Sequence, residues 1–353
     1  MPSQTQVESV VPLVTVVVVN WNRRDFLLCC LRSLAVQRGV EFEVIVIDNG
    51  SEDGSPEAAE ALQQCFRGGL QVIRNNTNRG FCGANNQGIA IARGQYIALL
   101  NNDAEADPEW LSSMTAAIAD RTQTGMVACK ILVYEDPTKI DKAGHLIWPD
   151  GQNRGRGTGE TDRGQYDREE PVLWPDGCAA LYRAQMLDEI GGFDEDLFAY
   201  GDDAELGLRA RIAGWQCIYT PAAVVRHHRG ATLGVRSSRR IELIERNRIL
   251  LAVRHFPLSL LLLNIPWFAA RLGAGFSAGL RGRGEAAKFA GVAEQFRLAR
   301  ALLNGFREGV SLIPHTWRKR KAPRAPRRLS DKEILQLLFA NKISIRALTE
   351  DAV

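Results

Sequence analysis

Short apolar runs alternate with amphipathic stretches through the first 130 residues. A continuous β-branched run at residues 13–19 (LVTVVVV) predicts a strand that is buried on both faces. Further strands are predicted at residues 43–47, 70–73 and 96–100, and helices around 27–34, from 55, over 83–93 and from 107. This alternation predicts an α/β fold with a Rossmann-like, mainly parallel sheet and helices on both faces. In such a sheet ligands bind beyond the carboxyl ends of the strands.

The remaining segments differ in character. Residues 1–11 are predicted to be disordered. Residues 144–170 are rich in glycine and charge with little periodicity, which predicts a mobile loop over the site, and strands and helices return over 178–220. Beyond residue 240 the pattern is helical. Within 289–306 apolar residues step by three and four with basic residues between them, which predicts an amphipathic helix.

Charge divides the chain into two parts. The net charge of the 353 residues is only +3. Before and including His228 there are 20 basic and 32 acidic residues, and after it 24 basic and 9 acidic, which gives −12 against +15. We therefore expect an acidic part able to hold a cation and a basic part attracted to phosphate-bearing surfaces.

Cysteine usage points to a reducing compartment. The seven cysteines show no CxxC spacing and no Cys/His pattern suited to zinc, so buried reduced thiols are expected. No charged n-region followed by an apolar h-region opens the sequence. Both observations favour the cytoplasm.

A polar triplet follows the predicted strand at 96–100. Asn101, Asn102 and Asp103 offer amide and carboxylate oxygens, which suit Mg²⁺ or Mn²⁺ bridging the phosphates of a nucleotide diphosphate. Alone, such residues are more often turn formers. Polar residues that end or follow the other predicted strands strengthen the metal interpretation.

Three further loops carry candidate ligands for a nucleotide. Asn20 ends the first strand, and Asp48 and Asn49 follow the next one, where they can contact a ribose or nucleobase edge or form an Asx-turn. The stretch from Asn78 to Asn86 (NRGFCGANN) begins a helix, where glycines allow close backbone approach and free N–H groups favour anions.

Later motifs add acids and imidazoles. Asp202, Asp203 and Glu205 lie just before or within a predicted helix, and one acid would suffice for a cap. The surplus indicates a general base for a sugar hydroxyl. His227 and His228 follow an apolar run, and imidazole is a common ligand for the softer of these cations.

Taken in order, six motifs resemble those of family 2 inverting glycosyltransferases of the GT-A fold, in particular the bacterial rhamnosyltransferase-like branch that builds O-antigen and exopolysaccharide. They are VVVVNWN, VIVIDNGSEDGS, NRGFCGANNQGI, YIALLNNDAEADPEWL, GGFDEDLFAYGDDAELGLRARIAGW and VVRHHRGAT. The resemblance covers roughly residues 12–250. It implies a GT-A domain over 12–235, with a donor half at about 12–125 and an acceptor half at about 126–235.

The resemblance also implies residue roles. Asp103 is the metal ligand, Asp203 the base, and His227 lies near the metal and diphosphate, with His228 as the register alternative. The residues expected to bind the sugar donor are Asn20, Asp48, Asn49, Arg79, Gly80, Asn85 and Asn102. Those expected to bind the acceptor are Asp176, Gly177 and Asp202.

Two positions depart from the family pattern. Asp202 stands where the family more often has Glu, a conservative change. Asn101-Asn102 replaces the commoner Asp in the first metal position, so coordination of Mg²⁺ or Mn²⁺ is expected to depend more on Asp103 and the phosphates of the sugar donor.

The expected function is metal-dependent, inverting transfer of a sugar, with rhamnose suggested by the resemblance. The sugar donor would be a UDP-, dTDP- or GDP-sugar, and the acceptor a saccharide or lipid-linked saccharide of a cell-surface polysaccharide. A sugar nucleotidyltransferase is disfavoured because residues 20–24 (NWNRR) contain no phosphate-loop glycine. A non-catalytic nucleotide-sugar binding module is disfavoured because the acids after residue 200 are retained.

The C-terminal part suggests a membrane surface. Residues 255–270 contain no Asp, Glu, Lys or Arg but are short for a membrane span, so they either insert at an interface or pack on the domain. With the helical segment 236–313 and the basic tail 314–353, which includes a short terminal helix, they predict peripheral binding to anionic lipid on the inner face of the cytoplasmic membrane. Nucleic acid is not expected, because no stacking aromatics accompany the basic run from Arg318 to Arg328.

Overall fold

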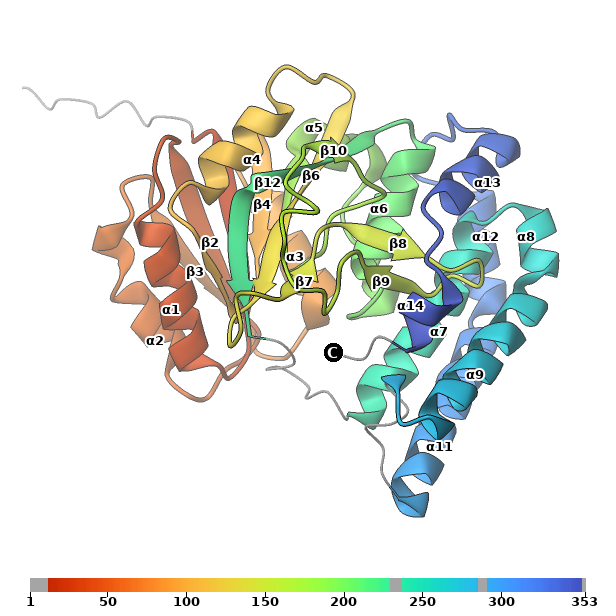
Figure 1. Cartoon of the computed structure of the whole chain (residues 1–353). Helices are drawn as coiled ribbons and strands as arrows, with labels where there is room; N and C mark the ends of the chain where they lie inside the picture. The colour runs from red at the N-terminus through yellow and green to blue at the C-terminus, as the bar shows by residue number, and fades with distance from the viewer. Residues whose placement is uncertain (1–11, 229–236, 285–290, 351–353) are drawn as a thin grey trace, which may run out of the picture.

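The computed structural model describes residues 12–228, 237–284 and 291–350, so the disorder predicted for 1–11 lies outside the described residues. Its centre is a mixed sheet in the order β10-β12-β6-β11-β4-β1-β2-β3, with β5 on β12 and β7 on β6 (Figure 1). The strands are β1 (Val14–Asn20), β2 (Phe42–Asp48), β3 (Leu70–Arg74), β4 (Tyr96–Leu100), β5 (Ala104–Ala106), β6 (Thr124–Val133), β7 (Ile140–Lys142), β10 (Glu170–Pro171), β11 (Ala179–Arg183) and β12 (Gln216–His227).

The alternation predicted for the first 130 residues is confirmed. The helices there are α1 (Arg24–Ala35), α2 (Ser55–Glu60), α3 (Gly80–Ile91) and α4 (Trp110–Ile118), followed later by α5 (Ala184–Ile190) and α6 (Asp202–Ile212). Strands β3, β2, β1 and β4 are parallel, whereas β11 runs antiparallel between β4 and β6. The register pairs Asn20 with Asp48, so these side chains lie at one edge of the sheet.

Two apolar cores cover the two faces of the sheet. Alternate residues of β1 divide between them: Val16 and Val18 pack with α1 and α4, and Val17 packs with α3, α5 and α6. Because both faces are covered, β1 needs apolar residues at successive positions, which is the continuous run seen in the sequence.

Residues 144–170, expected as a mobile loop, instead contain regular structure. Strands β8 (His145–Ile147) and β9 (Asn153–Gly155) form an antiparallel hairpin, and β10 adds to β12. Glycine-rich turns between short strands explain the missing periodicity, since two- and three-residue strands are too short to show alternation.

The C-terminal helices form a layer beside the sheet domain (Figure 1). They are α7 (Ser238–His255), α8 (Leu258–Leu262), α9 (Asn264–Leu280), α11 (Val292–Ser311), α12 (Ile313–Lys321), α13 (Asp331–Ala340) and α14 (Ile345–Thr349). Helix α13 contributes Ile334 and Leu338 to the core that contains α5 and α6, and Ile147 exchanges backbone hydrogen bonds with Asn341 and Ile343. Part of the segment predicted as a basic tail is therefore packed against the α/β domain.

Candidate active site

The ends of β1, β2 and β4 are joined by buried polar side chains. Asn102 Nδ2 donates to Asn20 Oδ1 at 2.8 Å, and Asn20 Nδ2 donates to Asp48 Oδ1 at 3.1 Å. Ser51 Oγ donates to the same Asp48 oxygen at 2.6 Å. Three residues predicted to bind the sugar donor therefore form one chain, because parallel strands bring their carboxyl ends to the same edge.

Other predicted sugar-donor residues shape the loop before α3. The Asn49 amide donates to Gly80 O at 3.2 Å and accepts from Arg79 N at 3.3 Å, and Asn85 Nδ2 donates to Phe81 O at 2.9 Å. Gly80 has φ +71°, and a Cβ there would lie 2.6 Å from the carbonyl oxygen of Phe198. The amides of Asn49 and Asn85 thus hold the backbone, while the Arg79 side chain is exposed at this edge.

Asp103 and His227 meet across the sheet edge. The β5–β12 pairing sets His227 opposite Ala104, and His227 Nε2 lies 3.4 Å from Asp103 Oδ1. On its other side, His227 Nδ1 lies 2.7 Å from the buried Asp141 carboxylate. Such a carboxylate fixes the orientation of an imidazole and leaves the other nitrogen to face a ligand.

The same pair fits a divalent cation. Apart from the imidazole of His227, Asp103 Oδ1 has no hydrogen-bond partner among the described residues, although it is buried. Burial alone would lower the pKa of His227, but Cys178, Asp103 and Asp141 more than offset it, so this pKa lies well above its ordinary value. A proton and a metal ion compete for the same Nε2. An orphaned carboxylate oxygen beside an oriented imidazole is a donor set that suits Mn²⁺.

His228 faces another environment. Its ring stacks on Tyr134 with centroids 3.5 Å apart, and its Nδ1 lies 2.9 Å from Glu135 Oε1. Of the two histidines that the sequence left as alternatives, the one beside Asp103 is His227.

The acid pair lies at the start of α6. Asp203 Oδ1 accepts from Ala204 N at 2.7 Å and Oδ2 accepts from Gly177 N at 3.3 Å. Burial raises the pKa of Asp203, although His145 and Lys142 act in the opposite direction. Burial and the nearby Asp203 and Asp176 carboxylates raise the pKa of Asp202 to about 8. A pKa of about 8 leaves Asp202 largely protonated at neutral pH. For Asp203, His145 and Lys142 partly offset the rise in pKa that burial and Asp176 cause.

The segment before the acid pair is held in an unusual conformation by α7. Phe198 and Tyr200 have φ values of +63° and +67°, which side chains other than Gly rarely adopt and which cost free energy. Asn247 Nδ2 donates to the carbonyl oxygens of Leu197, Ala199 and Tyr200 at 3.0, 2.9 and 2.6 Å. A helix outside the predicted GT-A domain thus positions Asp202 and Asp203.

Glu205, the third acid of that motif, has a structural environment. It is buried and contacts Arg209 at 2.7 Å and His255 Nε2 at 2.8 Å. Burial would raise its pKa, but Arg209, His255 and Arg254 hold it well below the ordinary value. Glu205 therefore ties α6 to α7.

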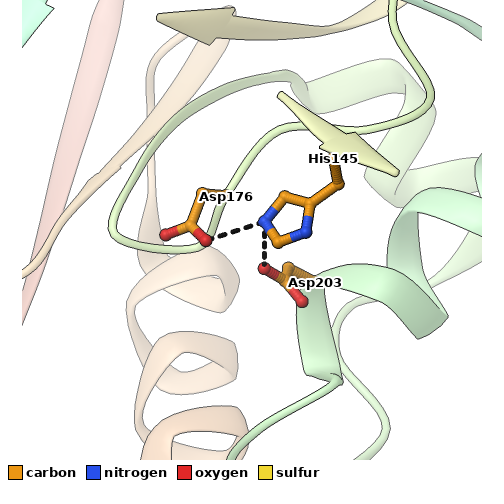
Figure 2. Close-up of side chains that lie close together, drawn as sticks. All are labelled: His145, Asp176 and Asp203. Atoms are coloured by element: carbon orange, nitrogen blue, oxygen red, sulfur yellow. Dashed lines mark hydrogen bonds and ion pairs between the residues drawn. The ribbon is translucent and has the colours of Figure 1, made fainter. Parts of the chain in front are cut away.

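Three polar residues of this region carry no signal in the sequence. Asp141, Lys142 and His145 lie on β7 and β8, inside or beside the stretch without periodicity. Lys142 Nζ lies 2.6 Å and His145 Nε2 lies 2.8 Å from Asp176 Oδ2, and Figure 2 shows His145 between Asp176 and Asp203. Because these strands are so short, only the folded chain reveals that Lys142 and His145 turn toward the acids and that Asp141 turns toward His227.

Comparison with known families decides what this arrangement belongs to. The model of "Glycosyl transferase family 2" matches residues 15–191, and that of "Glycosyl transferase family group 2" matches residues 158–279. The chain belongs to glycosyl transferase family 2. Its relatives include a protein named as a rhamnosyltransferase and one named for O-antigen biosynthesis, which is the branch that the six motifs resemble.

Two relatives illustrate this. The chain is 29% identical over 226 residues to the N-acetylglucosaminyl-diphospho-decaprenol L-rhamnosyltransferase of Mycobacterium tuberculosis, covering 57% of this chain and 71% of that protein. It is 29% identical over 233 residues to the O-antigen biosynthesis protein RfbC of Myxococcus xanthus, covering 63% of this chain. The match spans only 18% of the M. xanthus protein.

Solved structures show the fold. A mannosyltransferase from Pyrobaculum calidifontis in complex with GDP-Man and Mn²⁺ gives a TM-score of 0.55 at 19% identity, covering 85% of this chain and 87% of that one. S. aureus TarS 1–349 in complex with UDP gives 0.53 at 17% identity, covering 93% and 90%. The family 2 chain therefore has the predicted GT-A fold with a helical C-terminal region.

Proposed function

We propose that this family 2 enzyme is a metal-dependent inverting glycosyltransferase that moves a sugar from a nucleotide-diphosphate donor to a saccharide or lipid-linked saccharide. The observation that carries the proposal is the pairing of the Asp103–His227 cation site with a separate, buried acid pair at Asp202 and Asp203. Inversion needs one in-line attack, so the group that holds the leaving diphosphate and the base must be different.

In this mechanism the chain divides the work between two sets of residues. A cation at Asp103 and His227 would supply positive charge to the departing diphosphate. Asn20, Asp48 and Asn102 hold the nucleoside side of the sugar donor, with Asn49, Arg79, Gly80 and Asn85 forming the adjoining loop. Asp203 takes the proton of the acceptor hydroxyl while the acceptor oxygen attacks the anomeric carbon of the sugar donor. Asp176, Gly177 and Asp202 line the acceptor side.

The substrates follow from the relatives' chemistry. The M. tuberculosis relative is named for transfer of L-rhamnose to a diphospho-decaprenol-linked sugar, and the M. xanthus relative for O-antigen biosynthesis. Solved neighbours are complexed with GDP-Man or UDP, two of them together with Mn²⁺. We propose a UDP-, dTDP- or GDP-sugar, with rhamnose as the transferred sugar, a polysaccharide of the cell surface as the product, and Mg²⁺ or Mn²⁺ as the cofactor.

A hydrolysis screen tests the function and identifies the sugar donor. Purified protein is incubated with UDP-, dTDP- and GDP-sugars in Mn²⁺ or Mg²⁺, and release of nucleoside diphosphate is followed by chromatography. We expect slow, metal-dependent hydrolysis of one donor, which a saccharide acceptor accelerates. Binding of a nucleotide sugar without turnover of any donor, with every acceptor class tried, would instead indicate a non-catalytic binding module.

Helices α8 and α9 present an uncharged surface. Among the described residues, no helix combines the length and apolarity needed to cross a bilayer. The only charged residue of α9, Arg271, is turned inward onto Asp150 and Glu245. The strongly exposed apolar residues of α8, α9 and the residue between them are Leu258, Leu262, Leu263, Ile265, Phe276 and Leu280. A helix face this apolar is typical of interaction surfaces.

Basic residues accompany apolar ones on the neighbouring helix α11. Phe306 of α11 stacks on Phe268 of α9 with ring centroids 5.6 Å apart. Exposed Leu303 and Val310 lie one turn either side of Phe306, and Arg300 and Arg307 are exposed on the same helix. Apolar side chains flanked by arginine fit an anionic bilayer surface. We propose that this face binds the inner surface of the cytoplasmic membrane, where a lipid-linked acceptor is available.

Vesicle sedimentation tests the membrane surface. The double variant Phe276→Ser/Leu280→Ser should bind vesicles of anionic lipid more weakly than the unmodified protein, because it removes two of the most exposed apolar side chains. Binding of the unmodified protein should fall as salt rises, since screening weakens surface charge attraction. Val36→Ser, which alters an exposed apolar residue at the end of α1, is the matched control. Equal sedimentation with neutral and anionic vesicles would contradict the electrostatic part.

A further inference from the structure

His145 stands between two acids that have different surroundings. Its side chain is 5% exposed, and its Nε2 lies 2.8 Å from Asp176 Oδ2 and 3.4 Å from Asp203 Oδ2 (Figure 2). We call His145, Lys142, Asp176 and Asp203 the His145 cluster. Its members come from β8, β7, the loop before β11 and the start of α6.

The surroundings of the ring fix which nitrogen carries a proton. Both neighbours of Nε2 are carboxylate oxygens, which accept hydrogen bonds when ionised. Nδ1 is buried and has no hydrogen-bond partner among the described residues. Nε2 therefore carries hydrogen and donates to Asp176 Oδ2, and Asp203 Oδ2 lies 3.4 Å from the same nitrogen, at ion-pair distance.

Lys142 balances the charge of Asp176. Its Nζ lies 2.6 Å from the same Asp176 oxygen that His145 contacts. Burial would raise the pKa of Asp176, but Lys142 and His145 more than offset it and hold the pKa well below its ordinary value. Asp176 is thus a permanent carboxylate, and it keeps the His145 ring in place.

The His145 cluster has the composition of a cation site but not its charge balance. Ligand atoms of His145, Asp176 and Asp203 lie within 4.8 Å of one another. However, the Asp176 oxygen that a cation would use already contacts the Lys142 ammonium. A divalent ion would have to displace Lys142 and the Nε2 proton together, so we assign the cluster to hydrogen bonding.

The free lone pairs of the Asp203 carboxylate define where a substrate proton would go. Oδ2 faces both Gly177 N and His145 Nε2, whereas Oδ1 has one donor, Ala204 N. Each carboxylate oxygen can accept two hydrogen bonds. Oδ1 therefore has the free lone pair.

We propose that His145 is a positioning residue that favours the ionised form of Asp203 and leaves Oδ1 turned to the acceptor hydroxyl. The inference rests on the proposed function. In the reaction the acceptor O–H proton moves to Asp203 Oδ1, the acceptor oxygen bonds to the anomeric carbon, and the bond from that carbon to the diphosphate breaks with its electron pair on the diphosphate. His145 stays beside Oδ2 throughout, held by its hydrogen bond to Asp176, and does not touch the sugar.

The pH dependence of kcat/KM provides the test. Among the described residues, the charged and titratable groups near Asp203 are His145, Lys142, Asp176 and Tyr182 of β11, with Asp202 beside it on α6. Activity needs ionised Asp203 and so falls as the pH drops through its pKa. His145→Phe removes the imidazole that favours ionised Asp203, so the pKa of Asp203 should rise. The acidic limb of the pH profile, where kcat/KM falls as the pH drops, should then move up by about one pH unit. Below the limb that shift is about a tenfold loss of rate.

Further variants separate hydrogen bonding from packing. His145→Gln keeps an N–H donor and should restore most of the limb's position. Lys142→Met removes a positive charge that lowers the pKa of Asp203, so it should also move the acidic limb to higher pH. His315→Phe is the matched control, because His315 pairs with Asp196 on the surface and lies 50% exposed. Superimposable acidic limbs for His145→Phe, Lys142→Met and His315→Phe would overturn the proposal.

A direct titration keeps the inference separate from the proposed function. In protein labelled with ¹³C at aspartate carboxyl carbons, the Asp203 resonance is the one that Asp203→Asn removes. Its titration midpoint should rise in His145→Phe and change little in His315→Phe, whether or not a sugar is transferred. An unchanged midpoint would refute the role of His145, whereas a raised midpoint in a protein that turns over no sugar donor would refute the proposed function alone.

Discussion

Replacing Asp203 with Asn should lower kcat by about 10²- to 10⁴-fold while changing affinity for the sugar donor little, because general-base contributions are typically of this size. Asparagine keeps the shape of the side chain, but its NH₂ group cannot accept a hydrogen bond, so it retains only one of the two contacts with Gly177 N and Ala204 N. The missing base is expected to account for most of the loss in kcat. Asp103 and His227, which would hold the cation, are unchanged in this variant.

The neighbouring acids provide graded controls for that experiment. Asp202→Asn should cost less, because the pKa of Asp202 is raised to about 8 and a neutral amide resembles its protonated form at neutral pH. Glu205→Gln should appear as lower thermal stability, since Glu205 pairs with Arg209 and His255 and lies outside the acid pair. The measurements are kcat for each variant and NMR of the product anomer. A product that retains its anomeric configuration, or an Asp203→Asn enzyme as fast as the unmodified protein, would be incompatible with the mechanism.

Replacing Asp103 with Ala should abolish turnover and leave the fold intact. Asp103 is the only carboxylate in its triplet and its Oδ1 is buried beside His227, so no neighbouring acid of that triplet can take its place. EDTA should have the same effect, reversed by Mn²⁺ or Mg²⁺. A lone carboxylate also implies that the metal binds weakly until the diphosphate supplies further oxygen ligands.

The two adjacent histidines make this prediction sharper. His227→Ala should weaken Mn²⁺ binding in the presence of nucleoside diphosphate, measured by electron paramagnetic resonance. His228→Ala should retain it, because that ring stacks on Tyr134. Full activity after exhaustive chelation would remove the metal from the mechanism.

The sequence by itself predicted the strands of the first 100 residues, the loops that follow them and the resemblance to the family. Continuous apolar runs form strands that are buried on both faces of a sheet, which is why β1, β2 and β4 could be located from the sequence. Asn20 and Asp48 end β1 and β2, and Asn102 lies just beyond β4. These polar residues then had to meet at one edge, since parallel strands align their carboxyl ends. Asp202 and Asp203 could also be identified from the sequence, because adjacent acids before a helical pattern are a local feature.

Only the tertiary structure decided which histidine faces Asp103 and what surrounds the acids. His227 is the last residue of β12 and His228 follows it, so their side chains leave the backbone in different directions. The sequence does not say which of the two faces Asp103. Asp141, Lys142 and His145 come from strands too short to show a period. Asn247 holds the carbonyl oxygens of residues 197, 199 and 200 from a helix nearly 50 positions away. Such contacts depend on how distant elements pack, and local propensity and spacing carry no record of that.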